Sequence, residues 1–192
     1  RNVSAFAGLT HATGFPDQPP VRAGYATVDY MTAYLNAYGI MLALYNRDVN
    51  DSGGEVIDVC LAEAAFRSTE SALIDYSLTG NVRQRTGNRN VAFAPAENFE
   101  TKDGKILAIN AGTDRLFNKL VAVMEQPEIL TNPHFENRIA RTLCQEELYE
   151  IIGKWVKQMT AEEGLKLMDE AGIPADLVRD MSELAHHPHL RE

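Results

Sequence analysis

Cysteine is scarce in this sequence, and its two copies support neither a covalent framework nor a metal site. The 192 residues contain only Cys60 and Cys144, which lie far apart and have no histidine or second cysteine at metal-ligand spacing. Disulfide scaffolds and structural zinc sites need closely spaced sets of cysteines. We therefore expect two buried free thiols in a reducing compartment, and no bound metal.

Long apolar runs and clusters of basic residues are also missing. No apolar run approaches the roughly 20 residues of a membrane-spanning helix, and no charged-then-apolar signal segment opens the chain. Acidic residues outnumber basic ones by 27 to 18, for a net charge of -9, and the basic residues are scattered. This distribution does not suit a surface for nucleic acid or anionic lipid. We expect a soluble, cytoplasmic protein that binds neither nucleic acid nor membrane.

Several catalytic signatures are absent. The sequence has no Gly-x-Ser-x-Gly nucleophile elbow, no Gly-x-x-x-x-Gly-Lys phosphate loop and no Gly-x-Gly-x-x-Gly dinucleotide motif. The cluster His186-His-Pro-His189 lacks a second group of ligands, so a surface turn is the preferred interpretation.

The most informative segment that is present runs from Gly24 to Arg47. A proline-rich turn leads into it, Asp29 stands near its start, and apolar and small side chains then fall on nearly every face. A helix that is apolar all round is normally buried. Asp29 has two compatible interpretations: an N-cap of this helix, or a carboxylate held ready for covalent chemistry.

The remaining pattern predicts a mixed α/β chain, with a helix-dominated first part and a small α+β second part. The expected order is a helical segment at 1–14, a loop at 15–25, helix 28–47, strand 55–59, helix 61–78, loop 81–96, a hairpin at 97–110 that turns at Lys102-Asp103-Gly104, helices 113–124, 143–159 and 161–171, strand 175–178 and a helical turn at 182–187. The boxes Thr142-x-x-Gln145 and Thr160-x-x-Glu163 are expected to cap the helices at 143–159 and 161–171. The loop at 81–96 is the predicted boundary between the two parts.

An ordered set of short motifs resembles the family III CoA-transferases, the CaiB/BaiF group, which also includes acyl-CoA racemases. Each motif is weak alone, and the match lies in their order and spacing: Thr13-Gly14 before Pro19-Pro20-Val21-Arg22, the segment ending in Asp29, Leu42–Arg47 before Gly53-Gly54-Glu55 and Val56–Val59, Arg85-Thr-Gly-Asn88, Pro95 before Phe99–Gly104, Asn132–Phe135 with Arg138 and Arg141, and Ala171–Pro174 before His187–Arg191.

The resemblance implies part of the family fold and a chemical role for Asp29. Residues 1–90 would belong to a large Rossmann-like domain and residues 91–192 to a small α+β domain. Asp29 would attack an acyl-CoA thioester and carry CoA as an aspartyl-CoA thioester, while Arg85, Gly87 and Asn88 would bind substrate. Coenzyme A, as a thioester, and a carboxylic acid would be the partners, with no metal.

The resemblance also implies a longer protein and leaves the reaction open. We expect this chain to be an internal fragment, and the full-length protein to form an interlocked homodimer. One alternative is an α-methylacyl-CoA racemase that uses Asp29 for proton transfer. Another is a non-catalytic assembly fragment whose apolar helix exposes a surface for binding a partner. The donor and acceptor acids are not specified.

Overall fold

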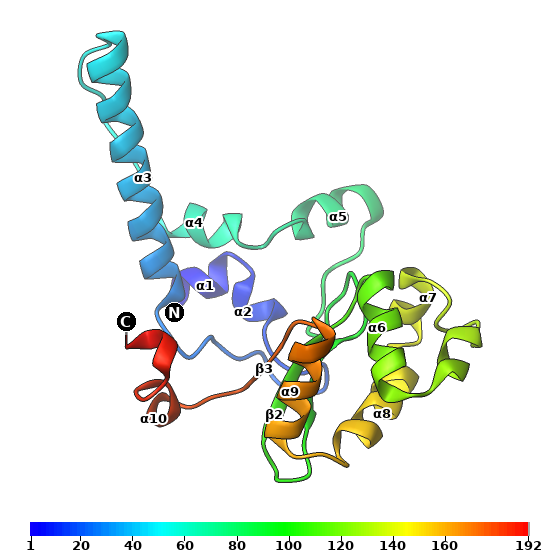
Figure 1. Cartoon of the computed structure of the whole chain (residues 1–192). Helices are drawn as coiled ribbons and strands as arrows, with labels where there is room; N and C mark the ends of the chain where they lie inside the picture. Colours follow the sequence, from blue (N-terminus) through cyan, green and yellow to red (C-terminus); the bar gives the residue numbers. More distant parts are fainter. Residues whose placement is uncertain (192) are drawn as a thin grey trace. The chain divides into compact units, whose positions relative to one another are not determined.

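The computed structural model describes residues 1–191 and divides into two compact units, Arg1–Gly87 and Asn88–Glu192 (Figure 1). Helices predominate in the described residues, and one three-stranded antiparallel sheet lies in the second unit. The prediction of a mixed α/β chain is confirmed.

The helices of the first unit are shorter and more interrupted than the sequence predicts. Its described residues form α1 (Asn2–Phe6), α2 (Leu9–Ala12), α3 (Thr27–Asn50), α4 (Leu61–Arg67) and α5 (Ala72–Thr79). The predicted helical segment at 1–14 breaks at Gly8, where φ is 84°. The predicted helix at 61–78 breaks near Glu70, where φ is 57°. A left-handed residue interrupts a right-handed helix, so each predicted helix becomes two.

Helix α3 is exposed, and the prediction that it is buried is wrong for this chain. None of its residues is buried, and Tyr34 is 72% exposed. Helix α4 packs against α3, but the described part of the first unit buries only three small side chains, Ala7, Ala64 and Ala65. The apolar pattern of α3 is therefore not matched by apolar neighbours within residues 1–87.

The predicted strand at 55–59 does not form. Residues 51–60 contain neither helix nor strand. A strand needs a hydrogen-bonded neighbour, and the described residues of the first unit contain no other strand. The alternating pattern is present, but its pairing partner is not.

The sheet of the second unit is built on the predicted hairpin, which is confirmed. Strands β1 (Ala96–Glu100) and β2 (Ile106–Asn110) pair antiparallel, and β3 (Ala175–Leu177) adds to β2, again antiparallel. The strand order is β1-β2-β3. At the turn, Gly104 has a φ of 77°, which glycine adopts without a steric penalty.

The described helices of the second unit lie at positions that the sequence largely predicts. They are α6 (Asp114–Met124), the 3-10 helix η1 (Pro127–Thr131), α7 (Arg138–Leu143), α8 (Gln145–Val156), α9 (Ala161–Ala171), α10 (Met181–Leu184) and the 3-10 helix η2 (Pro188–Leu190). Of these, α8 and α9 pack against the sheet. Thr160 and Glu163 form the predicted capping box of α9. The box predicted at Thr142 is wrong: its hydroxyl donates to the carbonyl of Arg138, and the predicted single helix is split into α7 and α8.

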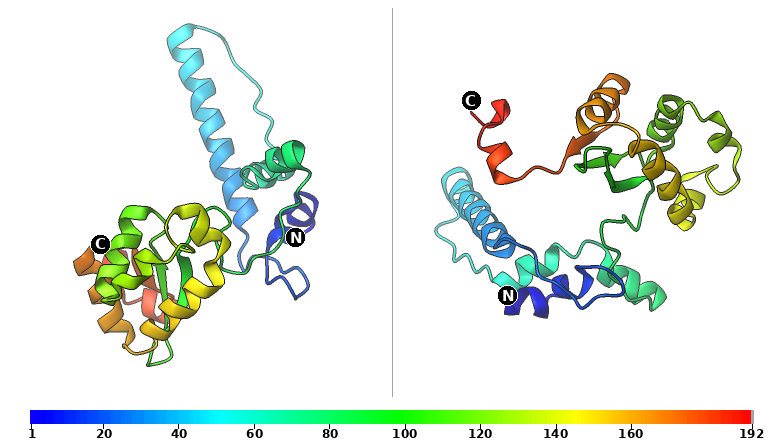
Figure 2. Two further views of the ribbon diagram at one scale, coloured as in Figure 1. Left: turned by 90° about the vertical axis from the view of Figure 1, so that its right-hand side faces the viewer. Right: turned by 90° about the horizontal axis from the view of Figure 1, so that it is seen from below.

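The core of the second unit lies between the sheet and its helices (Figure 2). Large apolar side chains from both layers are buried there, among them Phe99, Leu107, Ile109, Phe117, Leu120, Leu148, Ile152 and Met168. Burial of such a side chain contributes roughly 1.5–3 kcal/mol. This unit therefore has its own source of stability.

Arg141 joins three segments of the second unit from inside the core. Its side chain is 1% exposed and donates to the carbonyls of Ala94 (3.0 Å), Phe135 (3.3 Å) and Gly112 (3.3 Å). It also donates to Asp114 Oδ1 at 2.6 Å. The guanidinium carbon lies 4.4 Å from the centroid of the Phe117 ring. A buried charge persists where its donors are satisfied, as they are here.

Two further sequence predictions can be compared with the described residues. No helix within residues 1–191 combines the length and the hydropathy needed to cross a membrane. Both cysteines are free thiols, but Cys60 is exposed and Cys144 is half-buried. The prediction of two buried thiols is therefore wrong, because Cys60 occupies the N-cap of α4, where its Sγ accepts from Glu63 N at 3.4 Å.

Candidate active site

Asp29 lies in the first turn of α3 and does not cap the helix. The N-cap is Ala26, without a side-chain hydrogen bond, and the helix begins at Thr27. The N-cap interpretation of Asp29 is therefore wrong. Its carboxylate is exposed, and no hydrogen bond or ion pair joins it to another described residue. The first turn of a helix favours a negative charge through the helix dipole.

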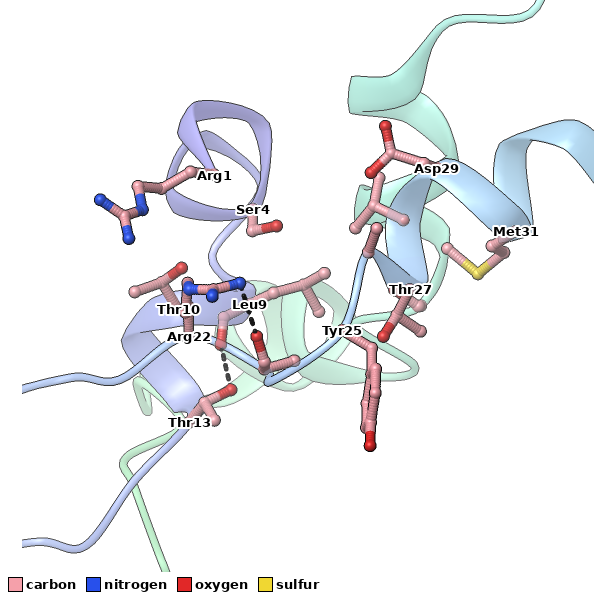
Figure 3. Close-up of a pocket in the computed structure, with 14 residues that line it drawn as sticks. Arg1, Ser4, Leu9, Thr10, Thr13, Arg22, Tyr25, Thr27, Asp29 and Met31 are labelled. Carbon is pink, nitrogen blue, oxygen red and sulfur yellow. Dashed lines mark hydrogen bonds between the residues drawn. The ribbon is translucent and has the colours of Figure 1, made fainter. Parts of the chain in front are cut away.

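A cavity of about 350 Å³ opens beside Asp29 (Figure 3). It is formed by α1, α2, the loop that precedes α3, and the first turn of α3. Its charged lining residues are Arg1, Arg22 and Asp29. Serine, threonine and tyrosine hydroxyls also line it, from Ser4, Thr10, Thr13, Tyr25, Thr27 and Ser68. Small-molecule sites occupy roughly 300–1,000 Å³, so the cavity is large enough for a small acid.

Hydrogen bonds join the two ends of the proline-rich part of the loop between α2 and α3. Thr13 Oγ1 donates to the carbonyl of Leu9 at 2.6 Å, and Val21 N donates to the carbonyl of Thr13 at 3.0 Å. These bonds bring the chain back to α2 after its prolines and set Arg22 on the wall of the cavity. In Figure 3, Arg1 and Arg22 are seen across the cavity from Asp29.

Arg85 and Gly87 bind the backbone at the start of this loop, and neither residue lines the cavity of Asp29. Arg85 donates to the carbonyls of His11 (3.1 Å) and Phe15 (3.3 Å), and Gly87 N donates to the carbonyl of Gly14 at 2.9 Å. Gly87 has a φ of 64°, and a Cβ there would lie 2.7 Å from the Phe15 ring. These contacts position the loop, while the expected binding of substrate by both residues stays a prediction.

Asn88, the third residue expected to bind substrate, belongs to the second unit. It lines a shallow cavity of about 500 Å³ with Asn98, Asn110 and Asp176 on the open face of the sheet. Its expected role also stays a prediction.

Groups of three or more histidine, cysteine, aspartate or glutamate side chains that could hold a metal ion are not found among residues 1–191.

Sequence reasoning did not identify Arg22 as a site residue. The signal was available, because Arg22 ends the Pro-Pro-Val-Arg motif that precedes Asp29. Its position on the cavity wall depends on the loop closing at Thr13 and Val21, which the residue pattern did not predict.

Comparisons with a family model and with curated proteins all match this chain to CoA-transferases. The model of CoA-transferase family III matches residues 1–192. A succinyl-CoA–D-citramalate CoA-transferase of Chloroflexus aurantiacus is 37% identical over 185 residues, which are 96% of this chain and 46% of that protein. A succinyl-CoA–L-malate CoA-transferase alpha subunit of Chloroflexus aurantiacus is 31% identical over 186 residues, 96% of this chain and 43% of that protein.

A solved structure shares the fold. The crystal structure of a CaiB/BaiF family protein from Brucella suis superposes with a TM-score of 0.75 at 24% identity, covering 98% of this chain and 50% of that one. The chain spans about half the length of the relatives it matches, 46% and 43% of the two Chloroflexus proteins.

Proposed function

Because the chain belongs to CoA-transferase family III, we propose that the full-length protein moves CoA from an acyl-CoA thioester to a free carboxylic acid, with Asp29 as the nucleophile. One observation carries the assignment of Asp29. Its carboxylate is exposed beside a cavity and has no partner among the described residues, so a substrate carbonyl can approach it.

In the first half of the proposed reaction, Asp29 takes up CoA. A carboxylate oxygen of Asp29 attacks the thioester carbonyl carbon, the C–S bond breaks, and CoA leaves as a thiolate. The product is a mixed anhydride between Asp29 and the acyl group. The thiolate then attacks the Asp29 carbonyl carbon, which releases the first acid and leaves an aspartyl-CoA thioester.

The second half repeats these steps with the incoming acid. Its carboxylate attacks the aspartyl thioester, thiolate leaves again, and the thiolate then attacks the acyl carbon of the new acid. Asp29 is regenerated as a carboxylate, and the exchange consumes no water, oxidant or reductant. Backbone N–H groups at the start of α3 can stabilise the negative oxygen that forms in each attack.

The names of the relatives favour a dicarboxylic acid as substrate. D-Citramalate and L-malate, which two of them are named for, each carry two carboxylates, and both of those proteins are named for succinyl-CoA as well. We extend this substrate class to the present protein. The homodimer and the cytoplasmic location implied by the resemblance remain predictions.

Peptide mass spectrometry of the full-length protein tests the covalent role of Asp29. After incubation with succinyl-CoA, hydroxylamine should trap Asp29 as a hydroxamate, and the unquenched peptide should carry the mass of CoA. Asp29→Asn should lose both adducts and CoA transfer. Asp48→Asn is the matched control, because Asp48 is an exposed aspartate on the same helix and should leave both unchanged.

Two other outcomes would exclude transfer through Asp29. Exchange of the α-proton of a branched acyl-CoA with solvent, without an adduct, would identify a racemase. Neither an adduct nor proton exchange with any acyl-CoA would leave a non-catalytic assembly role.

A further inference from the structure

Arg22 presents an unpaired positive charge to the cavity of Asp29. Among residues 1–191, its one hydrogen bond joins Nη1 to the carbonyl of the neighbouring Ala23 at 3.2 Å. Within residues 1–191, no carboxylate lies within ion-pair distance of Arg22 or of Arg1, the other arginine of the cavity. A guanidinium has five N–H donors in a planar fork, so most of those on Arg22 are free to meet a ligand.

The charge of the cavity is opposite to that of the chain. Its charged lining residues are two arginines and one aspartate, a sum of +1, whereas the chain carries -9. A local positive potential in an acidic protein attracts anions. Asp29 accounts for one end of a substrate, and the arginines provide a place for a second negative group.

We propose that Arg22 binds the second carboxylate of a dicarboxylic acid whose first carboxylate reacts at Asp29. This inference rests on the proposed CoA transfer and names the residue that selects diacids. A guanidinium pairs with a carboxylate through two parallel N–H···O bonds, which fixes the orientation of the acid as well as its affinity. Arg1 lies on the same wall and adds charge, while Arg22 is held by the loop closure at Thr13 and Val21.

The test compares two acceptors of equal chain length in the full-length protein, succinate and butyrate, with acetyl-CoA as the donor. Acetyl-CoA has no second carboxylate on its acyl group, so only the acceptor probes Arg22. Charge-assisted hydrogen bonds make a net contribution equivalent to about 10- to 100-fold in affinity. Arg22→Gln should therefore raise KM for succinate by about that factor. In Arg22→Gln, the KM for acetyl-CoA should stay within about 3-fold of the wild-type value. The same holds for butyrate, measured as a KM or, if it is not an acceptor, as an inhibition constant.

Two variants separate recognition from folding. Arg22→Lys keeps the charge without the planar fork, so its KM for succinate should lie between those of the wild type and Arg22→Gln. Arg47→Gln removes an exposed arginine of α3 that does not line the cavity, and it should leave every constant unchanged. If Arg22→Gln does not fold, Arg22→Lys still decides, because its KM should rise above the wild-type value for succinate and stay at the wild-type value for butyrate.

Three results would overturn the proposal. An equal rise in KM for succinate and butyrate would mean that Arg22 does not distinguish the second carboxylate. A rise in KM for acetyl-CoA alone would place a CoA phosphate on Arg22. A wild-type protein that transfers CoA to butyrate but not to succinate would rule out a diacid site. Wild-type protein with no CoA transfer to any acid would instead contradict the proposed function itself.

Discussion

At the scale of single residues, burial separates the two notable arginines of this chain. Arg22 is exposed with a mostly free guanidinium, whereas Arg141 is enclosed and donates to three carbonyls and one carboxylate. The same side chain is thus available for a ligand in one place and structural in the other. Both arginines belong to motifs of the family resemblance, and the sequence pattern alone does not distinguish the ligand-facing arginine from the buried one.

Replacing Arg141 should destabilise the second unit. Arg141→Met leaves buried carbonyls of Ala94, Gly112 and Phe135 without their donor, and each unsatisfied group costs about 1–3 kcal/mol. We expect a loss of about 3 kcal/mol or more in the free energy of unfolding, measured by urea denaturation with hydrogen exchange of peptides from residues 88–191.

Arg138→Met is the matched control for this substitution. Arg138 lies on the same helix, α7, but is exposed, so its replacement should change the free energy of unfolding by less than about 0.5 kcal/mol. Equal effects of the two substitutions would show that Arg141 has no special structural role.

At the scale of elements, side-chain hydrogen bonds fix the entry to α9. Glu163 accepts from the backbone N–H and the hydroxyl of Thr160, both at 2.8 Å. Asp103, in the hairpin turn, accepts from Ala161 N at 2.9 Å and from the Thr101 hydroxyl at 2.7 Å. These bonds join the hairpin to the helix, and they lower the pKa values of both carboxyls.

Acid should weaken the α9 capping box. The pKa of Glu163 is lowered in the folded chain, mainly by the hydrogen bond from the Thr160 backbone. The folded state therefore binds this proton less readily than the unfolded state. Its contribution to stability is present above the ordinary pKa of 4.5 and is lost as the pH falls through the folded value.

Glu163→Gln isolates this effect, because glutamine keeps the shape of the side chain and its ability to accept from the cap but removes the charge. The difference in free energy of unfolding between wild type and Glu163→Gln should be largest near neutral pH and should shrink as the pH falls below the ordinary pKa of 4.5. Glu162→Gln, at an exposed neighbouring position without the box hydrogen bonds, should show a smaller pH dependence. A difference that stays constant with pH would contradict the assignment.

At the scale of the whole molecule, the two units differ in how much they bury. The second unit has a continuous apolar core, whereas the first buries only Ala7, Ala64 and Ala65 among its described residues. Local stability follows the number of buried contacts. The cavity of Asp29 thus lies in the unit that we expect to be the less stable of the two.

Hydrogen exchange of the 192-residue chain should reveal this difference directly. Backbone amides of α3 should exchange within seconds to minutes, because a helix that buries none of its own residues is marginal, while those of β2 and α6 should be protected far longer. Helix α6 is the internal control, since it is a helix with one buried face. Protection of α3 equal to that of α6 would contradict the prediction.

How much of the fold could be predicted depends on whether the signals were local. The hairpin turn at Asp103-Gly104, the helix predicted at 113–124 and the Thr160–Glu163 box depend on neighbours in the sequence, and all were predicted correctly or within a residue. The breaks at Gly8 and Glu70, and the split between α7 and α8, were missed. A left-handed residue or a change of cap leaves the apolar periodicity almost intact.

The candidate site was predictable only in part, and for a physical reason. The sequence by itself determined that an aspartate stands near the start of an apolar helix, and its ordered motifs led to the family. Only the tertiary structure decided that Asp29 lies beyond the cap position, that Arg22 is on the wall of the same cavity and that Arg141 is buried. It also left Val56–Val59 without a partner strand among residues 1–191. Each of these depends on contacts between distant segments, whose geometry is set by loop closure and packing rather than by local periodicity.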